Sequence, residues 1–296
     1  MILEGCFTAI VTPFLKTGAK PQIDWRGYKR LVEFQNENEI SGIVACGTTG
    51  ESPTLSHGEH NKVIELTVEN SSCVVIAGTG SNCTWEAIEM TERAKDAGAD
   101  ASLQVVPYYN KPSQEGLYRH FGAIAEAVDM PHILYNVPGR TSKEIAPETM
   151  ARLSEEYSNI VAVKEASGNE EVWKGITEAC SSDFQIISGN DADTFRLMKD
   201  YRGCGVISVA SNVIPQRMAE FVKLGLDESF LEMEREHNAL SEFFDVLFVD
   251  TNPVPVKEAL NILGLSCKGY RFPLCETSAE NKERISSVLK SMGVQN

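Results

Sequence analysis

The chain alternates short apolar runs with longer stretches that mix apolar and polar residues. Most of the runs are apolar throughout, which is typical of strands that are covered on both faces of a parallel sheet. The pattern therefore predicts a series of buried strands. They span residues 7–11, 42–46, 74–77, 101–106, 133–136, 161–164, 185–188 and 206–210.

Several of the stretches between these strands carry helix start signals. Ser56 and Glu59 form a capping-box pattern, in which the hydroxyl and the carboxylate each satisfy an N–H group at the helix end. Asp24 and Ser113 are expected N-caps, and Pro147 suits a first turn. The glycines expected at helix exits are Gly98, Gly203 and Gly225.

Strands that alternate with helices indicate βαβ units and a parallel sheet. Eight regular units favour closure into a barrel over an open doubly wound sheet. After residue 224 the strand pattern stops, and helices are expected at 227–248, 253–263 and 279–292. The sequence therefore predicts an α/β protein, in which a (β/α)8 TIM barrel forms a catalytic domain over 1–224 and a C-terminal helical domain follows over 225–296.

The charge of the chain narrows the choice of partners. Its 27 lysines and arginines are outnumbered by 42 aspartates and glutamates, which gives a formal net charge of −15. Such a surface repels phosphate backbones and anionic membranes, so nucleic acid and membrane are not expected partners. No segment approaches the roughly 20 apolar residues of a membrane helix, and the first residues lack the pattern of a signal peptide. We expect a cytoplasmic protein.

Metal, disulfide and nucleotide sites are not expected. The eight cysteines form no CxxC pair, and no histidine cluster completes a zinc pattern. A chain of this length without export signals is not expected to rely on disulfides. Gly78 and Gly80 begin a GxGxxG-like pattern, but Cys83 stands where the third glycine would be. The sequence therefore predicts no metal ion and no organic cofactor.

The strand ends carry the chemistry, because TIM-barrel enzymes place their active sites at the C-terminal ends of the strands. Lys164 directly follows the apolar residues 160–163, so its stem is expected inside the barrel. Burial disfavours the ammonium form of a lysine. A neutral amine attacks ketones and forms an iminium that withdraws electrons from the adjacent carbon. The alternative is a buried ion pair, for which Glu165 is the neighbouring candidate.

Hydroxyl groups and one arginine follow other strands. Thr48, Thr49, Tyr109 and Tyr135 could relay protons and bind a small carboxylate together with loop N–H groups. Schiff-base formation needs such proton delivery, although a tyrosine at a strand end can also serve packing alone. Arg140 could hold a second carboxylate through two parallel hydrogen bonds. A surface salt bridge is the alternative for this arginine.

Four segments give the chain a family resemblance. They are GTTGESPTL at 47–55, PYYNKPSQEGLYRHF at 107–121, YNVPGRT at 135–141 and VAVKEASG at 161–168. Over essentially its full length the chain resembles the dihydrodipicolinate synthase and N-acetylneuraminate lyase superfamily, and most closely its dihydrodipicolinate synthase family. The resemblance implies a lyase that condenses pyruvate with L-aspartate-4-semialdehyde through a lysine Schiff base. The product would be 4-hydroxy-tetrahydrodipicolinate, in lysine and diaminopimelate biosynthesis.

The resemblance also implies catalytic roles. Lys164 matches the Schiff-base lysine, and Tyr135 matches the tyrosine that shuttles protons during imine formation and cyclisation. Thr48 and Tyr109 match the other members of its proton relay, with the tyrosine supplied by a neighbouring subunit. We therefore expect a homo-oligomer, a tetramer built from two tight dimers.

Three further matches concern substrate binding. Thr49 and Ile207 match positions that contact pyruvate, and Arg140 matches the entrance arginine that binds the carboxylate of the aldehyde. A sialic acid lyase, which handles a long polyhydroxylated substrate, is not expected to keep this arginine. Another pyruvate-dependent class I aldolase, acting on a sialic or sugar acid, is one alternative. A non-catalytic barrel that only binds a ligand is the other.

A regulatory site is implied as well. Feedback-inhibited members of the family bind L-lysine at a subunit interface, through residues matched here by Ser52, His57, His60, Asn82, Glu86 and Tyr108. Glu86 could pair with the amino group of this effector. The alternative for His57 and His60 is one face of a solvated helix, and no third ligand nearby suggests a metal site.

Overall fold

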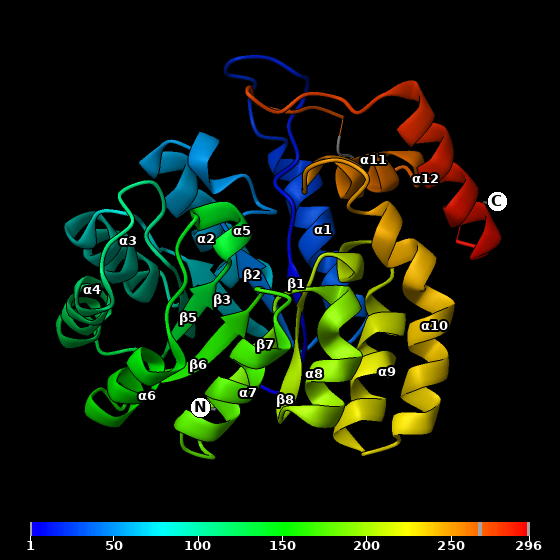
Figure 1. Cartoon of the computed structure of the whole chain (residues 1–296). Helices are drawn as coiled ribbons and strands as arrows, with labels where there is room; N and C mark the ends of the chain where they lie inside the picture. Colours follow the sequence, from blue (N-terminus) through cyan, green and yellow to red (C-terminus); the bar gives the residue numbers. More distant parts are fainter. Residues whose placement is uncertain (1, 266–267, 295–296) are drawn as a thin grey trace.

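The predicted strands close into a parallel barrel. A computed structural model of the chain describes residues 2–265 and 268–294. Its strands follow one another in sequence order, and β8 pairs with β1 (Figure 1). This closure confirms the TIM barrel and excludes the open sheet. The strands are β1 Gly5–Ala9, β2 Gly42–Ala45, β3 Val74–Gly78, β4 Ala101–Val105, β5 His132–Asn136, β6 Ile160–Glu165, β7 Gln185–Ser188 and β8 Gly203–Ser208.

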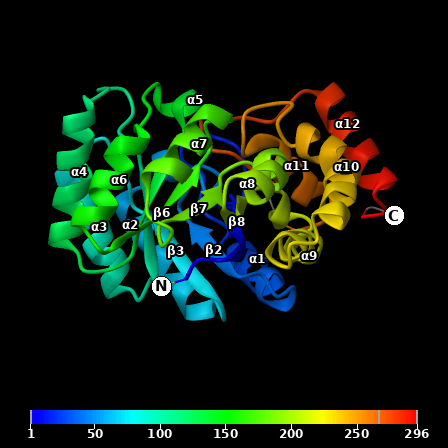
Figure 2. The same cartoon turned by 60° about the horizontal axis from the view of Figure 1, so that its bottom comes forward.

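Helices cover the outside of this barrel (Figure 2). The predicted helix starts are confirmed: Asp24, Ser56 and Ser113 each accept a hydrogen bond from an N–H group of the first turn, and Pro147 opens α6. The helices are α1 Trp25–Glu37, α2 His57–Asn70, α3 Thr84–Asp96, α4 Gln114–Ala127, α5 Pro138–Thr141, α6 Pro147–Glu156, α7 Glu170–Ala179, α8 Thr194–Asp200 and α9 Pro215–Leu226.

Two of the predicted helix exits are wrong. Gly98 follows α3 with a φ of +94°, as expected of a helix exit. Gly203, however, is the first residue of β8, which begins three residues before the predicted strand at 206–210. Gly225 lies inside the last turn of α9, where a Cβ atom would come within 2.6 Å of Met198 Cε. Gly225 therefore lies in close contact with a methionine side chain inside the helix and does not form a turn after it.

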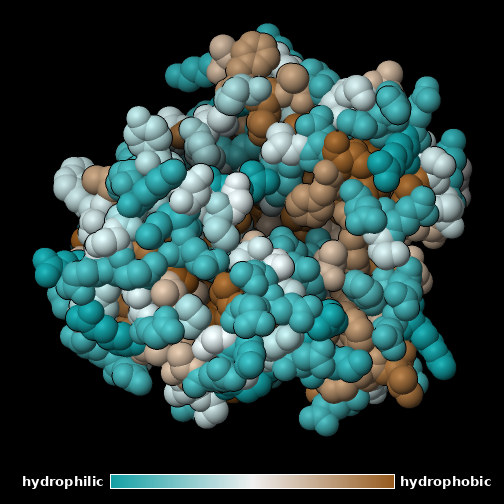
Figure 3. Space-filling view, viewed as in Figure 1, coloured by the Kyte–Doolittle hydropathy of each residue, from teal (hydrophilic) through white to brown (hydrophobic). Residues whose placement is uncertain are grey.

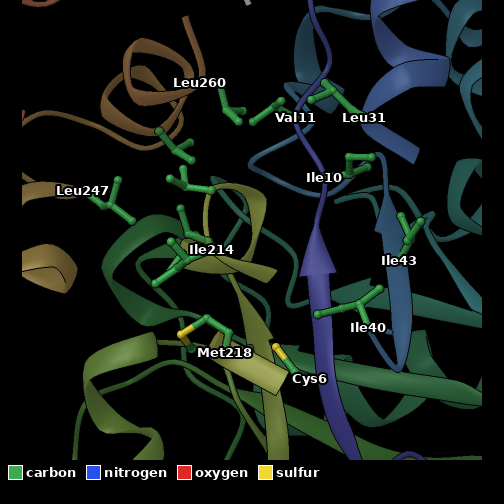
Figure 4. Close-up of a cluster of buried hydrophobic side chains, with 14 of the residues drawn as sticks. Cys6, Ile10, Val11, Leu31, Ile40, Ile43, Ile214, Met218, Leu247 and Leu260 are labelled. Carbon is green, nitrogen blue, oxygen red and sulfur yellow. The ribbon is translucent and has the colours of Figure 1, made fainter. Parts of the chain in front are cut away.

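Three helices after α9 form the C-terminal extension, α10 Phe230–Val246, α11 Val254–Ile262 and α12 Ala279–Ser291. Both views place them on the side of the barrel covered by α8 and α9. Leu247 and Leu260 of the extension belong to the same apolar cluster as Val11 and Ile214 (Figure 4). The extension thus shares a core with the barrel. The division of the chain into two domains at residues 224 and 225 stays a prediction.

The chain beyond α11 returns to the C-terminal end of the barrel. Isolated bridges pair Phe14 with Gly269 and Gly18 with Arg271. The loop after β1 and the segment that contains Gly269 and Arg271 therefore lie side by side, at the top of Figure 1. This arrangement brings parts of the extension next to the strand ends, where the sequence predicts the active site.

Alternate residues of the strands fill the barrel interior. Tyr135 packs there in one cluster with Ile207. Strand register pairs Tyr135 with Lys164, and Asn136 with Glu165, across β5 and β6. Because successive residues of a strand face opposite sides, Lys164 shares the interior with Tyr135, whereas Glu165 faces the surrounding helices.

The face seen in Figure 3 is mainly hydrophilic, in agreement with the net charge of −15. Within the described residues, no helix is long and apolar enough to cross a membrane. The described cysteines are all free, and Cys267 lies outside the described residues.

Candidate active site

Lys164 and Tyr135 lie side by side at the C-terminal end of the barrel interior. Lys164 is on β6 and is 7% exposed, and its Nζ is 4.3 Å from the centroid of the Tyr135 ring. Tyr135 on β5 is buried as well. Lys164 follows the apolar residues 160–163 and is buried, as predicted. The lysine amine therefore lies against the ring of the tyrosine, and both side chains are buried.

Glu165 is not the partner of Lys164. Its carboxylate accepts hydrogen bonds from the Asn136 amide at 2.8 Å and from the Ser167 N–H at 2.6 Å. Burial raises the pKa of Glu165, and these two donors act in the opposite direction. The predicted alternative, a buried ion pair between Lys164 and Glu165, is therefore wrong, because strand alternation points the two side chains to opposite faces of the sheet.

The turn after β2 carries both predicted threonines. The Glu51 N–H donates to the Thr48 carbonyl over 3.0 Å, and Cys46 and Glu51 on either side of Thr48 adopt left-handed φ angles of 58° and 56°. Thr48 lines a cavity. Thr49 is buried, and its hydroxyl accepts a hydrogen bond of 3.0 Å from the Asn252 amide. One threonine thus faces the cavity and the other contacts the extension.

Arg140 lies at the same cavity. It belongs to α5, which follows β5 directly, and it is exposed. Its Nη2 donates to the Asn252 carbonyl over 3.4 Å. None of the ion pairs between described residues includes Arg140, so the predicted alternative of a surface salt bridge is wrong for this part of the chain. A backbone oxygen orients the guanidinium, and most of its five donors are left for a ligand.

One cavity is lined by some of the predicted catalytic residues and some of the predicted effector residues, and Lys164 is not among its lining residues. Its volume is 390 Å³, and it is lined by Thr48, Tyr135 and Arg140 as well as by His57 and Glu86. This volume falls within the range typical of small-molecule sites. The other predicted effector residues in its wall are Ser52, His60 and Tyr108.

Glu86 lies at the centre of the predicted effector residues. Its carboxylate is 3.1 Å from His57 Nε2 and accepts a hydrogen bond from the Ser81 hydroxyl. Asn82 donates from its amide to the Tyr108 carbonyl over 3.1 Å. The Glu86 carboxylate thereby joins α2 to the start of α3, and a separate hydrogen bond joins Asn82 to the loop after β4.

His60 does not lie on a solvated helix face. It is 3% exposed, its Nε2 is 2.8 Å from the Gly78 carbonyl, and burial lowers its pKa. The alternative that His57 and His60 form one exposed face is therefore wrong for His60. Among residues 2–265 and 268–294, no group of three histidine, cysteine, aspartate or glutamate side chains could hold a metal ion.

Tyr109 and Ile207 are the remaining predicted residues, and only Tyr109 lies away from the barrel interior. Tyr109 is 89% exposed, with a φ of 72°. Ile207 is 1% exposed and packs in the interior cluster that contains Tyr135. The chain therefore brings Lys164 and Ile207 close to Tyr135, while the Tyr109 side chain extends into solvent.

Asn252 was missed by the sequence reasoning, although it contacts both Thr49 and Arg140. The Asn-Pro pair at 252–253 signals a turn, but it does not indicate which part of the fold that turn meets. The fully buried ion pair of Glu51 and Lys257 was missed for the same reason, because the two residues are 206 positions apart in the sequence.

Comparisons with known proteins identify the family of the chain. The model of the dihydrodipicolinate synthetase family matches residues 2–292. A 4-hydroxy-tetrahydrodipicolinate synthase of Methanocaldococcus jannaschii is 47% identical, over 99% of this chain and 100% of that protein. The structure of dihydrodipicolinate synthase from Acinetobacter baumannii complexed with pyruvate is 42% identical, with a TM-score of 0.95 over 99% of this chain and 100% of that chain.

A further similar structure, from Cyanidioschyzon merolae, has lysine bound. It is 40% identical, with a TM-score of 0.94 over 98% of each chain. Family model, relative and structures each cover nearly the whole chain, including every predicted site residue. The chain therefore belongs to the dihydrodipicolinate synthetase family.

Proposed function

We propose that this protein condenses pyruvate with L-aspartate-4-semialdehyde through a Schiff base on Lys164. The product is 4-hydroxy-tetrahydrodipicolinate, an intermediate of lysine and diaminopimelate biosynthesis. The observation that carries the proposal is the buried Lys164 amine, 4.3 Å from the Tyr135 ring at the strand ends of the barrel. A relative with 47% identity is a 4-hydroxy-tetrahydrodipicolinate synthase, and a similar structure is complexed with pyruvate.

In the first half of the reaction, the Lys164 amine attacks the ketone carbon of pyruvate. Tyr135 donates a proton to the hydroxyl of the resulting carbinolamine, which leaves as water and gives the iminium. Loss of a proton from the pyruvate methyl group then forms an enamine. The iminium nitrogen takes up the electron pair, so the chemistry calls for no metal ion and no organic cofactor.

In the second half, the enamine carbon attacks the aldehyde of aspartate semialdehyde. The amino group of that substrate closes onto the iminium carbon and releases Lys164. Arg140 binds the substrate carboxylate, which the acidic surface of the protein would otherwise repel. Thr49 and Ile207 contact pyruvate, and Ile207 supplies an apolar wall.

Tyr109 completes the proton relay of a neighbouring subunit together with Thr48. Its exposed fraction of 89% and the 65% exposure of Trp85 leave two large aromatic side chains uncovered in one chain. Solvent-exposed aromatic groups of this size are enriched at protein interfaces. These observations support an interface between subunits, and we propose that it belongs to a homotetramer built from two tight dimers.

Mixed dimers test this exchange. Lys164→Ala and Tyr109→Ala proteins would be denatured together and refolded, and the coupled activity compared with that of each variant alone. If Tyr109 acts in the neighbouring site, one site of each mixed dimer contains both native residues and activity returns. Activity no higher than the sum of the two variants would contradict the exchange.

L-lysine is proposed as a feedback inhibitor that binds between His57, Glu86 and the residues around them. The Glu86 carboxylate lies in the cavity wall and supplies the charge that an amino group needs. The similar structure with lysine bound supports this choice of effector. We also place the enzyme in the cytoplasm, where free cysteines are usual.

Two measurements separate the proposed reaction from the alternatives. Borohydride reduction with pyruvate should add the mass of the reduced adduct to wild-type protein and to the exposed-lysine control Lys174→Ala, but not to Lys164→Ala. Turnover of aspartate semialdehyde, coupled to the reductase that consumes the product, should show the same dependence. An adduct without turnover would indicate a different aldehyde or sugar acid, and no adduct would indicate a non-catalytic barrel.

A further inference from the structure

We propose that Lys257, in the C-terminal extension, is a positioning residue for the turn that carries Thr48 and Thr49. The inference rests on the proposed Schiff-base chemistry. Lys257 is on α11 and is 0% exposed. Its Nζ is 2.5 Å from Glu51 Oε1 and 3.1 Å from the Thr12 carbonyl.

Both partners of Lys257 are bonded to the turn itself. The Glu51 N–H donates to the Thr48 carbonyl over 3.0 Å, and the Thr12 hydroxyl donates to the Gly50 carbonyl over 2.7 Å. Lys257 therefore ties together the loop after β1 and the turn after β2. The ammonium reaches Thr48 through one intermediate residue.

Glu51 needs such support because of its backbone. Its φ of 56° lies in the left-handed region, which a residue with a side chain adopts only when its surroundings enforce it. Glu51 as a whole residue is 3% exposed, and its carboxylate is held by the ion pair with Lys257. Loss of the pair would allow Glu51 to relax, and the Thr48 carbonyl would lose a fixed donor.

The surroundings of the ion pair make it rigid. Lys257 Nζ is 4.6 Å from the centroid of the Phe14 ring and 4.8 Å from that of the Tyr270 ring. In a low-dielectric cage of this kind, a charged hydrogen bond is strong and removal of one partner is costly. An ion pair that only attached the extension to the barrel could involve any buried acidic residue. This pair instead involves Glu51, whose backbone is in the left-handed region and which lies in the turn that carries Thr48.

A second ion pair shows that the extension holds the rest of this segment as well. Arg271 is 2% exposed and binds Glu59 through two hydrogen bonds of 2.7 and 2.8 Å, and it also donates to the Thr54 carbonyl over 2.8 Å. Lys257 thus holds the end of the segment nearest to Thr48, and Arg271 holds the end at the start of α2.

The test measures formation of the pyruvate imine in Glu51→Gln, in Lys257→Met and in the double variant. The double variant is included because it leaves no lone buried charge, which protects the experiment against simple unfolding. Quenching with borohydride at short times gives the rate constant, and thermal midpoints verify folding. We expect the rate constant to fall about 10- to 100-fold, the effect typical of a small misplacement of a catalytic group.

The pattern of constants separates positioning from stability. KM for pyruvate should rise and KM for the aldehyde should not, because Arg140 is held by the Asn252 carbonyl and not by Glu51. Glu236→Gln is the control, since its ion pair with Arg217 joins α10 to α9 away from the turn. This control variant should lower only the thermal midpoint and leave the rate of imine formation unchanged. If the Glu51→Gln variant or the double variant is folded and forms the imine at the wild-type rate, the positioning role of Lys257 is wrong. If the wild-type protein forms no imine, the proposed function is wrong instead.

Discussion

Lys164 and Tyr135 are register partners on neighbouring parallel strands, and the lysine Nζ lies 4.3 Å from the centre of the tyrosine ring. The register of β5 and β6 therefore determines which side chains meet inside the barrel. One position further along, Asn136 and Glu165 form the matching pair on the outer face, 2.8 Å apart. The amine and the phenol are thus held by the backbone, not by a flexible loop.

Tyr135→Phe should slow imine formation while leaving Lys164 able to react. The ring keeps its place in the interior cluster, and only the hydroxyl that carries the proton is lost. We expect kcat to fall about 10²- to 10⁴-fold, the usual worth of general acid–base catalysis. Borohydride trapping over long times should still label Lys164 completely. Unchanged kcat would show that another group delivers the proton.

Arg140→Ala should raise KM for aspartate semialdehyde far more than KM for pyruvate. Two charge-assisted hydrogen bonds to the substrate carboxylate would be lost, which corresponds to about 10- to 100-fold in affinity. Arg140→Lys is the matched control, because it keeps the charge but not the two parallel donors. Its KM for aspartate semialdehyde should lie between those of the wild type and of Arg140→Ala. Steady-state kinetics with each substrate varied in turn gives the answer, and equal effects on both constants would contradict the assigned role.

The barrel could be predicted because its strands are continuous apolar runs. The predicted and observed bounds coincide even for β7, at Gln185–Ser188, where two buried isoleucines lie between polar end residues. Lys164 could be placed for the same reason: a charged residue that ends an apolar strand must lie at the rim of the barrel. β8 ends two residues before the predicted strand end at residue 210. The reason is that the N–H groups of Val209 and Ala210 donate to the Asp191 carboxylate and not to a neighbouring strand.

The contacts of the extension could not be predicted from the sequence. Asn252 meets Thr49 across 203 positions, and Lys257 meets Glu51 across 206. Neither pairing leaves a periodic signal, because each depends on how α11 packs against the barrel. A lysine within a helix of mixed composition is usually expected at the surface. Only the fold shows that Lys257 is fully buried.

Glu86→Ala should abolish inhibition by L-lysine without abolishing turnover. Its carboxylate is the acidic group in the cavity wall that pairs with His57, and an amino group bound there would lose its counter-charge. Glu89→Ala is the control, because Glu89 lies on the same helix and pairs with Arg93. The measurement is turnover against lysine concentration. A wild type that millimolar lysine does not inhibit would end the effector assignment.

Glu59→Gln should destabilise the protein at neutral pH and lose this effect in acid. Hydrogen bonds from Arg271 lower the pKa of Glu59 from its ordinary value of 4.5 to about 2. Because the pKa is lower in the folded state, the stabilisation is present above pH 4.5 and is lost as the pH falls towards 2. The expected cost at pH 7 is about 2 kcal/mol, typical of a hydrogen bond to a charged group.

Denaturant unfolding of Glu59→Gln and wild type at a series of pH values measures this difference directly. Glu65→Gln is the matched control, because Glu65 lies on the same helix but is exposed to solvent. Its curve should follow that of the wild type at every pH. The two curves of Glu59→Gln and wild type should converge between pH 4.5 and 2. A difference that stays constant over this range would mean that packing of the Arg271 side chain, and not the charge of Glu59, holds the start of α2.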